Sequence, residues 1–205
     1  MATKLIGLGS KARIGKDYAA KQLADWCGSV ERIAFADALK QDVAYLFGQH
    51  KLDYWSIEQE PELKEKIRPL LVEYGCTMRK FNENIWVDRA LKGKNFTKDI
   101  TLITDVRFPN EANRIKELGG YYIEIQTDLP PANETEAHYS PLMAGLADFT
   151  IKNNFDSNFV GDLIELIGNL ERVDQRLWKK TQSKESSFIH STEGVTGSVT
   201  WTQKA

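Results

Sequence analysis

The chain has 205 residues, with 27 Lys and Arg against 29 Asp and Glu and a formal net charge of −2. This length allows one substantial apolar core, and the slightly negative charge argues against nucleic-acid binding through a basic surface. No apolar stretch is as long as a membrane span, and the start of the chain lacks a signal-peptide apolar region. We expect an intracellular protein in which Cys27 and Cys76 are buried free thiols.

The first predicted elements are a strand at residues 3–8, a loop, and a helix that starts at Lys16 and stops at Gly28. We call residues 10–17, with the sequence SKARIGKD, the phosphate loop. Backbone N–H groups in such a loop and at the helix start bind phosphate oxygens, and Lys16 adds a positive charge at the outer phosphates. This order predicts a nucleoside triphosphate site. The alternative is an ordinary strand-to-helix turn in which Asp17 interacts with the helix dipole.

The phosphate loop departs from the general pattern G-x-x-x-x-G-K-[ST] at two positions. Ser10 stands at the first glycine, with Gly9 one place earlier, and Asp17 replaces the hydroxyl residue that ligates Mg²⁺. A carboxylate beside a triphosphate is repelled unless a cation lies between them. Asp17 therefore indicates either a metal-bridged site or a side chain that is turned away.

The middle of the chain begins with a predicted short strand at 30–35 and a predicted helix at 37–47. A mostly helical stretch follows. We predict a polar loop at 49–60, a helix from Pro61 that Pro69 kinks or breaks, and a helix at 83–91. An acceptor that carries a phosphate needs several cations around it. Three arginines in this stretch could supply them: Arg68, Arg79 and Arg89. The alternative places them on solvated helix faces.

A buried strand at 100–104 is followed by Asp105 and Arg107, then a helix at 110–118 and a strand at 121–125. A carboxylate at the tip of such a strand, near a phosphate loop, is suited to organising Mg²⁺. Arg107 follows closely and suits phosphate oxygens. The alternatives are a helix-capping role for Asp105 and a structural ion pair for Arg107.

The last core elements are a strand at 149–152 and a helix at 157–172, after a polar loop at 127–141. Residues 173–205 are polar, and we predict either a hairpin around Glu193-Gly194 or a flexible tail. Five strands that alternate with helices predict an α/β fold with a five-stranded parallel sheet. Ligands of such sheets bind at the carboxyl ends of the strands.

Residues 3–172 resemble the bacteriophage deoxynucleoside monophosphate kinases, in the order GSKARIGKDYAA, FADALKQDVAYLFG, IRPLLVEYGCTMRKFNENIWVDRAL, ITDVRFPNEANRIKELGGYYIEI and ADFTIKNNFDSNFVGDLIELI. The Gly-Lys-Asp end of the phosphate loop and the D-V-R-F-P-N-E segment are the most specific parts. The resemblance implies a P-loop kinase fold over residues 1–172, with a helical acceptor-binding region at 49–98, a lid at 127–141 and an extension at 173–205.

The resemblance also implies roles for individual residues. ATP would contact the phosphate loop and the residues around it, namely Ser10, Lys11, Ala12, Arg13, Ile14, Gly15, Lys16, Asp17, Tyr18, Asn153 and Asn154. Asp17 and Asp105 would organise Mg²⁺. The acceptor would contact Asp37, Arg68, Arg79, Trp86 and Arg107, although Asp37 is equally suited to cap a helix and Trp86 to fill the core.

Catalysis is accordingly assigned to Lys16, Arg13, Asp105 and Arg107. The lid candidate contains no Arg or Lys, so charge neutralisation falls to Lys11, Arg13, Arg107 or Arg114. We expect ATP-dependent phosphorylation of deoxynucleoside monophosphates in the cytoplasm, which is the host cytoplasm if the gene belongs to a phage. Only small-molecule substrates are expected, with no nucleic acid and no membrane, and a homodimer is left open. The alternatives are a kinase for another small phosphorylated acceptor and a non-catalytic nucleotide-binding module.

Overall fold

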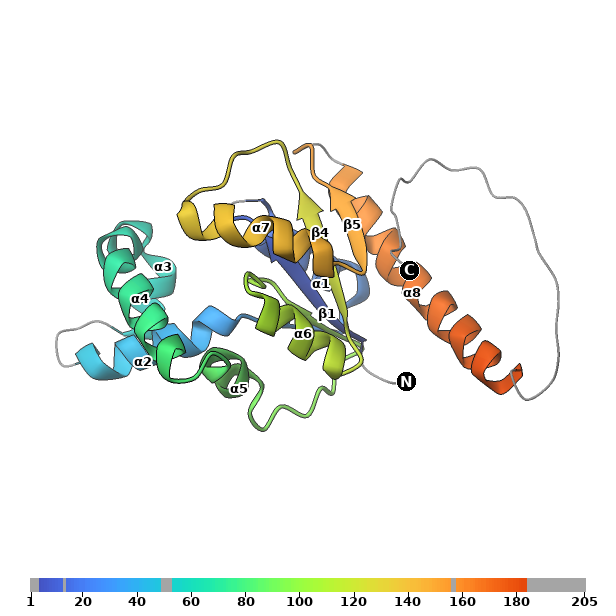
Figure 1. Ribbon diagram of the computed structural model, residues 1–205, viewed down its shortest axis with the longest axis horizontal. Coiled ribbons are helices and arrows are strands. Elements are labelled where there is room, and N and C mark those ends of the chain that lie inside the picture. The colour runs from blue at the N-terminus through green and yellow to red at the C-terminus, as the bar shows by residue number, and fades with distance from the viewer. Residues whose placement is uncertain (1–3, 13, 49–52, 156–157, 184–205) are drawn as a thin grey trace.

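The computed structural model describes residues 4–12, 14–48, 53–155 and 158–183. Five parallel strands form one sheet in the order β2-β3-β1-β4-β5, which confirms the predicted α/β architecture (Figure 1). The strands are β1 (Lys4–Ser10), β2 (Val30–Ile33), β3 (Ile100–Ile103), β4 (Tyr121–Gln126) and β5 (Phe149–Lys152). Because β1 is the central strand, the phosphate loop opens at the middle of the carboxyl edge.

Helices cover both faces of the sheet, and each face has its own apolar cluster. Helices α1 (Lys16–Cys27) and α8 (Asn158–Ser183) pack on the face to which Ile6 and Leu8 point. Helices α6 (Pro109–Glu117) and α7 (Glu134–Leu146) pack on the face to which Leu5 points. Successive strand residues thus serve opposite faces, as the pleat of a strand requires.

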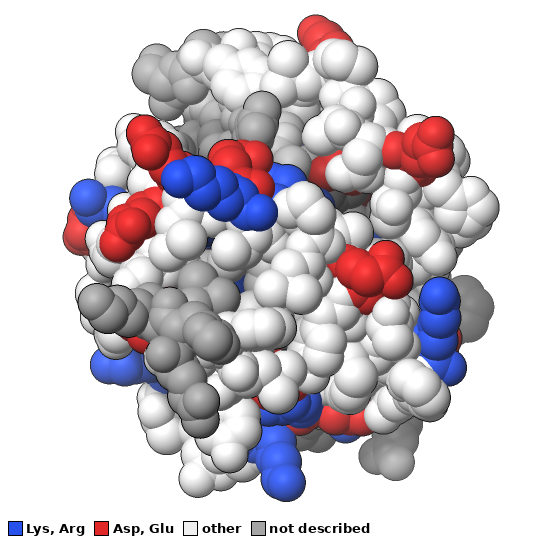
Figure 2. Space-filling view, turned by 90° about the vertical axis from the view of Figure 1, so that its left-hand side faces the viewer, with Lys and Arg blue, Asp and Glu red and all other residues white. Residues whose placement is uncertain are grey.

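Four further helices lie beside the sheet rather than on it, at the left of Figure 1. They are α2 (Phe35–Phe47), α3 (Tyr54–Gln59), α4 (Pro61–Phe81) and α5 (Ile85–Leu91). Figure 2 faces this end of the molecule and shows acidic and basic side chains close together on its surface. Trp86 and Val87 of α5 are buried in the same apolar cluster as Phe35 of α2, which joins this region to the sheet.

Two predicted loops contain helices, and a predicted helix break does not occur. Residues 49–60 are not a loop throughout, because Asp53 caps α3 by accepting a hydrogen bond from the N–H of Ser56. Pro69 does not break its helix, since α4 continues to Phe81, and α4 packs against α3 and α5. The lid candidate contains most of α7, whose first turn is capped by Asn133 and which continues past Pro141.

Two smaller differences concern the chain ends and the cysteines. Helix α8 reaches Ser183, beyond the predicted end at residue 172, and the predicted hairpin around Glu193 lies outside the described residues. Both thiols are free, but neither is fully buried as predicted: Cys27 is half-buried and Cys76 is exposed. Within the ranges that the structure describes, no helix is both long and apolar enough to span a membrane.

Candidate active site

The phosphate loop turns from β1 into α1 through Gly15, which has a φ of 79° in the left-handed region. Glycine adopts this conformation without steric cost, so its place before Lys16 follows from the backbone. Asn153, at the end of β5, supports the turn: its buried side-chain amide donates to the Ile14 carbonyl at 3.0 Å. The side-chain carbonyl oxygen of Asn153 accepts from the N–H of Phe155 at 2.7 Å. Asn153 therefore joins the loop to the segment after β5.

Lys16 points inward, and only 7% of its surface is exposed. Its ammonium donates to the Lys11 carbonyl at the start of the loop. Burial lowers the pKa of this ammonium to about 8, and the neighbouring charge of Arg107 acts in the same direction. The carboxylates of Asp105, Glu136 and Asp17 oppose that shift. Lys16 is thus a desolvated cation next to the loop amides.

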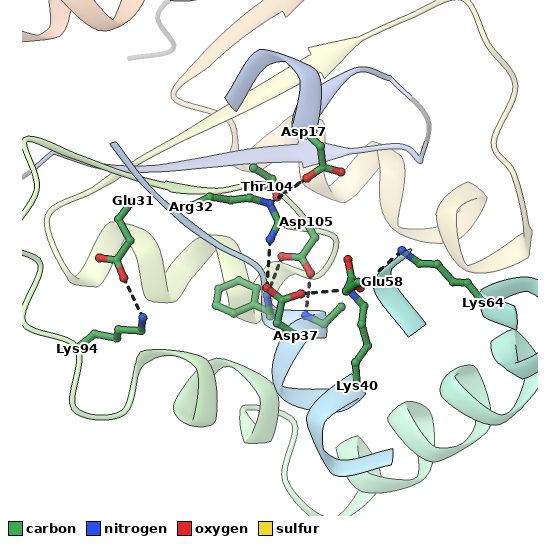
Figure 3. Close-up of polar contacts among 12 residues, drawn as sticks. Asp17, Glu31, Arg32, Asp37, Lys40, Glu58, Lys64, Lys94, Thr104 and Asp105 are labelled. Carbon is green, nitrogen blue, oxygen red and sulfur yellow. Dashed lines mark hydrogen bonds and ion pairs between the residues drawn. The ribbon is translucent and has the colours of Figure 1, made fainter. Parts of the chain in front are cut away.

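The two carboxylates predicted to organise Mg²⁺ have different surroundings (Figure 3). Asp17 is largely exposed and accepts hydrogen bonds from the Thr104 hydroxyl and from the Arg32 guanidinium, each at 3.1 Å. Asp105 is half-buried and accepts from the N–H groups of Phe35 and Ala36, each at 2.8 Å. Burial raises the pKa of the Asp105 carboxyl, while the two N–H groups act against that shift. Asp105 therefore caps α2.

A magnesium ion can be tested against these groups. In the part of the chain that the structure describes, no three His, Cys, Asp or Glu side chains gather in a way that could hold a metal ion. Mg²⁺ in phosphate sites needs few protein ligands, because phosphate oxygens and water supply the rest. The Asp17 carboxylate and the Thr104 hydroxyl are oxygen donors beside Lys16, so they fit this ion. The two hydrogen bonds that Asp105 accepts leave it less suited to direct ligation.

A hollow of about 470 Å³ opens beside the phosphate loop, between the start of α1 and the segment that joins β5 to α8. Two half-exposed aromatic rings, Tyr18 and Phe155, are on its walls, and the backbone of Phe155 is in the left-handed region at a φ of 61°. The full lining is Gly15, Tyr18, Gln22, Asn153, Phe155, Phe159, Val160 and Gly161. Asn154 is exposed and does not belong to this lining. The hollow therefore offers aromatic surface next to the loop.

On the other side of the loop, a chain of ion pairs runs from α1 to α4 (Figure 3). Arg32 joins Asp17 to Asp37, with 3.1 Å between Arg32 Nη1 and Asp37 Oδ2. Lys40 is buried and joins Asp37 at 3.0 Å to Glu58 at 2.5 Å. The ammonium of Lys64 lies 3.7 Å from Glu58. These ion pairs thus line the carboxyl end of β2.

Arg32, Lys40 and Glu58 were not among the site residues predicted from the sequence. The spacing of Asp37 and Lys40, one turn apart on a predicted helix, was an available signal for their ion pair. Glu58 could not be placed, because the residues around it were predicted to be a loop.

The predicted acceptor residues are only partly brought together. Arg79 donates to Glu111 at 2.8 Å and stacks over the Phe108 ring, with its guanidinium carbon 4.0 Å from the ring centre. Glu111 also accepts from the backbone N–H of Arg107, which places Arg79 close to the D-V-R-F-P-N-E segment. Arg68 is exposed and pairs with Glu65 of its own helix.

The remaining predicted residues divide between core, surface and undescribed positions. Trp86 is buried and donates its indole N–H to the Gly75 carbonyl at 3.3 Å, which makes it part of the core. Arg114 is an exposed partner of Glu117 on α6. Arg13 and the side chain of Ser10 lie outside the described part of the phosphate loop.

Arg107 and the loop amide of Ala12 share one partner, Glu136 in the first turn of α7. The Glu136 carboxylate lies 2.9 Å from Ala12 N and 3.3 Å from Arg107 Nη1. The side chain of Lys11 donates to the carbonyls of Thr127, at 3.4 Å, and Leu129, at 2.6 Å. Side chains thus connect the phosphate loop to the segment that leads into α7.

Three known proteins are similar to this chain over most of its length. A protein of Acanthamoeba polyphaga mimivirus, which carries the provisional name deoxynucleotide monophosphate kinase, is 29% identical over 83% of this chain and 99% of its own. Shikimate kinase from Bacteroides thetaiotaomicron matches with a TM-score of 0.43 at 11% identity, over 83% of this chain and 99% of that one. Dephospho-CoA kinase from Campylobacter jejuni matches with a TM-score of 0.38 at 13% identity, over 84% and 98%.

A family model provides the assignment. The model described as phosphomevalonate kinase matches residues 8–120, which is more than half of the chain and includes the phosphate loop, the helical region and Asp105. The chain therefore belongs to this kinase family of the P-loop type, and it is a phosphotransferase.

Proposed function

We propose that this kinase transfers the γ-phosphoryl group of ATP to the phosphate of a deoxynucleoside monophosphate. The observation that carries the proposal is the buried Lys16 beside a glycine-turned loop at the centre of the carboxyl edge of the sheet. The name of the mimivirus relative, which matches across 83% of this chain, supports this acceptor. Phosphoryl transfer depends on positioning and charge neutralisation, and both can be assigned to residues of this site.

ATP would bind along the phosphate loop. The amides of the loop and the ammonium of Lys16 would hold the outer phosphates, because they are the desolvated donors at the start of α1. The base would lie in the hollow between Tyr18 and Phe155, where stacking needs only exposed ring faces. Asn153 would act indirectly, by holding the Ile14–Gly15 turn in place.

Asp17 would hold Mg²⁺, and the Thr104 hydroxyl would orient the Asp17 carboxylate through the hydrogen bond that joins them. When bound, the ion neutralises charge on the outer phosphates of the donor. Asp105 would not ligate the ion directly, because both of its carboxylate oxygens accept hydrogen bonds from N–H groups at the start of α2. Its contribution would be to hold α2 in place.

The acceptor would lie over the carboxyl end of β2, where Arg32, Asp37 and Lys40 converge. Arg79 and Arg107 would approach its phosphate from the opposite side, near the start of α6. The second pKa of a phosphate monoester is about 6, so the acceptor is mostly dianionic at neutral pH and needs no general base.

A second candidate acceptor follows from the family model, whose description names phosphomevalonate kinase. Phosphomevalonate and a deoxynucleoside monophosphate both present a phosphate monoester to the transferred group. The same cations would therefore serve both, and the remainder of the acceptor would distinguish them.

A coupled assay of ADP release tests the proposal. ATP and Mg²⁺ are combined with dAMP, dGMP, dCMP and dTMP, with their ribonucleotide counterparts, and with phosphomevalonate. We expect ADP release that depends on one or more deoxynucleoside monophosphates. Release with phosphomevalonate alone would replace the proposed acceptor with the second one. ATP binding without release across the panel would contradict both and favour a nucleotide-binding module.

A further inference from the structure

Glu136 is a buried carboxylate that points into the phosphate loop. It lies in the first turn of α7, where Asn133 caps the helix by accepting from the Glu136 N–H at 2.9 Å. Its Oε1 accepts from the N–H of Ala12 at 2.9 Å and from Arg107 at 3.3 Å. Its Oε2 accepts from the N–H of Ala132 at 3.0 Å. Three donors, two of them parts of the candidate site, thus converge on one anionic side chain.

The partners of Glu136 are those that a phosphate would use. The amide of Ala12 belongs to the loop whose N–H groups bind phosphate oxygens, and a guanidinium pairs with phosphate as readily as with carboxylate. The negative charge of Glu136 also opposes the lowering of the Lys16 pKa by burial, which places this charge near a second cationic group of the site. A carboxylate and a phosphate cannot share these donors, because like charges at this separation repel.

We propose that Glu136 occupies the place of an ATP phosphate in the nucleotide-free protein and has to withdraw before ATP binds. Glu136 thereby sets the affinity of the site for ATP. The proposal rests on the ATP site of the proposed function and is independent of which acceptor the enzyme uses.

Withdrawal of Glu136 requires the start of α7 to move. Residues 127–133 form the linker between β4 and α7, and the side chain of Lys11 donates to two of its carbonyls, those of Thr127 and Leu129. The Ala12–Glu136 hydrogen bond adds a third tie between the loop and this segment. ATP would replace Glu136 on Ala12 and Arg107, and the Ala132 N–H would lose its acceptor.

The direct test is ATP titration by calorimetry, without an acceptor, of the full chain carrying Glu136→Gln. A glutamine removes the charge and turns an NH₂ group toward at least one of the three donors. We expect the Kd for ATP to fall about tenfold, which corresponds to about 1.4 kcal/mol of binding free energy. Glu134→Gln, in the same helical turn but exposed, is the matched control and should leave the Kd unchanged. An unchanged or higher Kd in Glu136→Gln would overturn the proposal.

Hydrogen exchange on the unmutated protein gives a second test that does not depend on how the variant folds. ATP binding normally protects amides, whereas the proposal expects faster exchange at the Ala132 amide once Glu136 has left it. Equal or slower exchange there would count against the withdrawal of Glu136.

These experiments separate the inference from the proposed function. If the wild-type protein binds ATP but phosphorylates no acceptor in the panel, the proposed function fails and the Glu136 titration can still be interpreted. If neither the wild-type protein nor Glu136→Gln binds ATP, both fail. Binding by the variant alone supports the inference.

Discussion

The phosphate loop and the region around β2 and α3 hold their polar groups in different ways. In the phosphate loop, side chains bind backbone groups: Asn153 and Lys16 donate to loop carbonyls, and Glu136 accepts from a loop amide. Around α3, side chains bind side chains, in the chain from Arg32 through Asp37 and Lys40 to Glu58. Backbone contacts fix the shape of a loop, whereas a chain of ion pairs can exchange partners when a charged ligand arrives. We therefore expect the backbone of the phosphate loop to be preformed, with Glu136 leaving it when ATP binds, and the ion pairs on the acceptor side to rearrange.

The largest effect is expected from Lys16→Ala. Lys16 supplies the desolvated positive charge at the outer phosphates, so its loss removes transition-state stabilisation that no nearby solvated lysine can replace. We predict a fall in kcat of at least about 10²- to 10³-fold, the range for loss of one preorganised donor. The measurement is the coupled assay, with circular dichroism to show that the fold is intact. Near-normal turnover would exclude this lysine, and with it the phosphate-loop assignment.

On the acceptor side, Lys40→Met should reduce stability. The variant keeps the apolar stem but leaves Asp37 and Glu58 without their shared, buried partner. Because the site is only partly enclosed, we predict a loss of about 2 kcal/mol in the free energy of unfolding, below the 3–5 kcal/mol of a fully buried pair. Urea denaturation measures it.

Lys64→Met is the matched control for Lys40→Met. Lys64 is more exposed and its ammonium is 3.7 Å from Glu58, so its removal should cost less than about 0.5 kcal/mol. Equal stability of the two variants would show that the chain of ion pairs does not hold α3 against α2.

On the ATP side, Asn153→Ala tests whether backbone contacts preform the loop. It removes the donor to the buried Ile14 carbonyl and the acceptor of the Phe155 N–H. Leaving a buried polar group without a partner costs about 1–3 kcal/mol, so we expect the Kd for ATP to rise about tenfold. Asn154→Ala changes the exposed neighbour and should have little effect in the same titration. Equal affinities would mean that the loop keeps its shape without Asn153.

The smallest effect concerns pH. Because the pKa of Lys16 is lowered to about 8, the ammonium loses its charge as pH rises through that value. ATP affinity should therefore fall about fourfold between about pH 7 and about pH 8.5. The contribution of Lys16 to the free energy of unfolding has the opposite sign: the unfolded chain binds the extra proton between the two pKa values, so stability rises over that interval. Lys16→Arg, whose guanidinium stays charged, should show a flat affinity profile.

The contrast between the two regions also explains what could be predicted from the sequence. The phosphate loop is local: Gly15, Lys16 and the start of α1 are consecutive, so their relation is fixed by spacing. The third strand was predictable because β3 is a continuous apolar and β-branched run. The partners of Asp105, in contrast, are the N–H groups of Phe35 and Ala36, which are 70 and 69 residues away. No pattern in the sequence indicates a contact over that separation.

The helical region was harder to predict because its signals are weak. Helix α3 has one buried residue, Ile57, so its residues lack an apolar periodicity. Arg68 and Arg79 lie on the same helix, yet one faces solvent and the other packs on Phe108, a difference that depends on the position of α6. The sequence did not decide whether Trp86 belongs to the core or to the acceptor site. Its hydrogen bond to Gly75 depends on how α4 and α5 pack against each other.

The capping of α2 by Asp105 restricts how the enzyme can close over its substrates. Both oxygens of this half-buried carboxylate attach the first turn of α2 to the end of β3, the strand that pairs with the central strand β1. The start of α2 therefore moves with the sheet as one rigid body, and any hinge for the acceptor-side helices has to lie farther along the chain. A substitution at Asp105 would loosen that attachment. A loss of activity in such a variant could therefore come from a displaced start of α2 as readily as from a lost metal ligand.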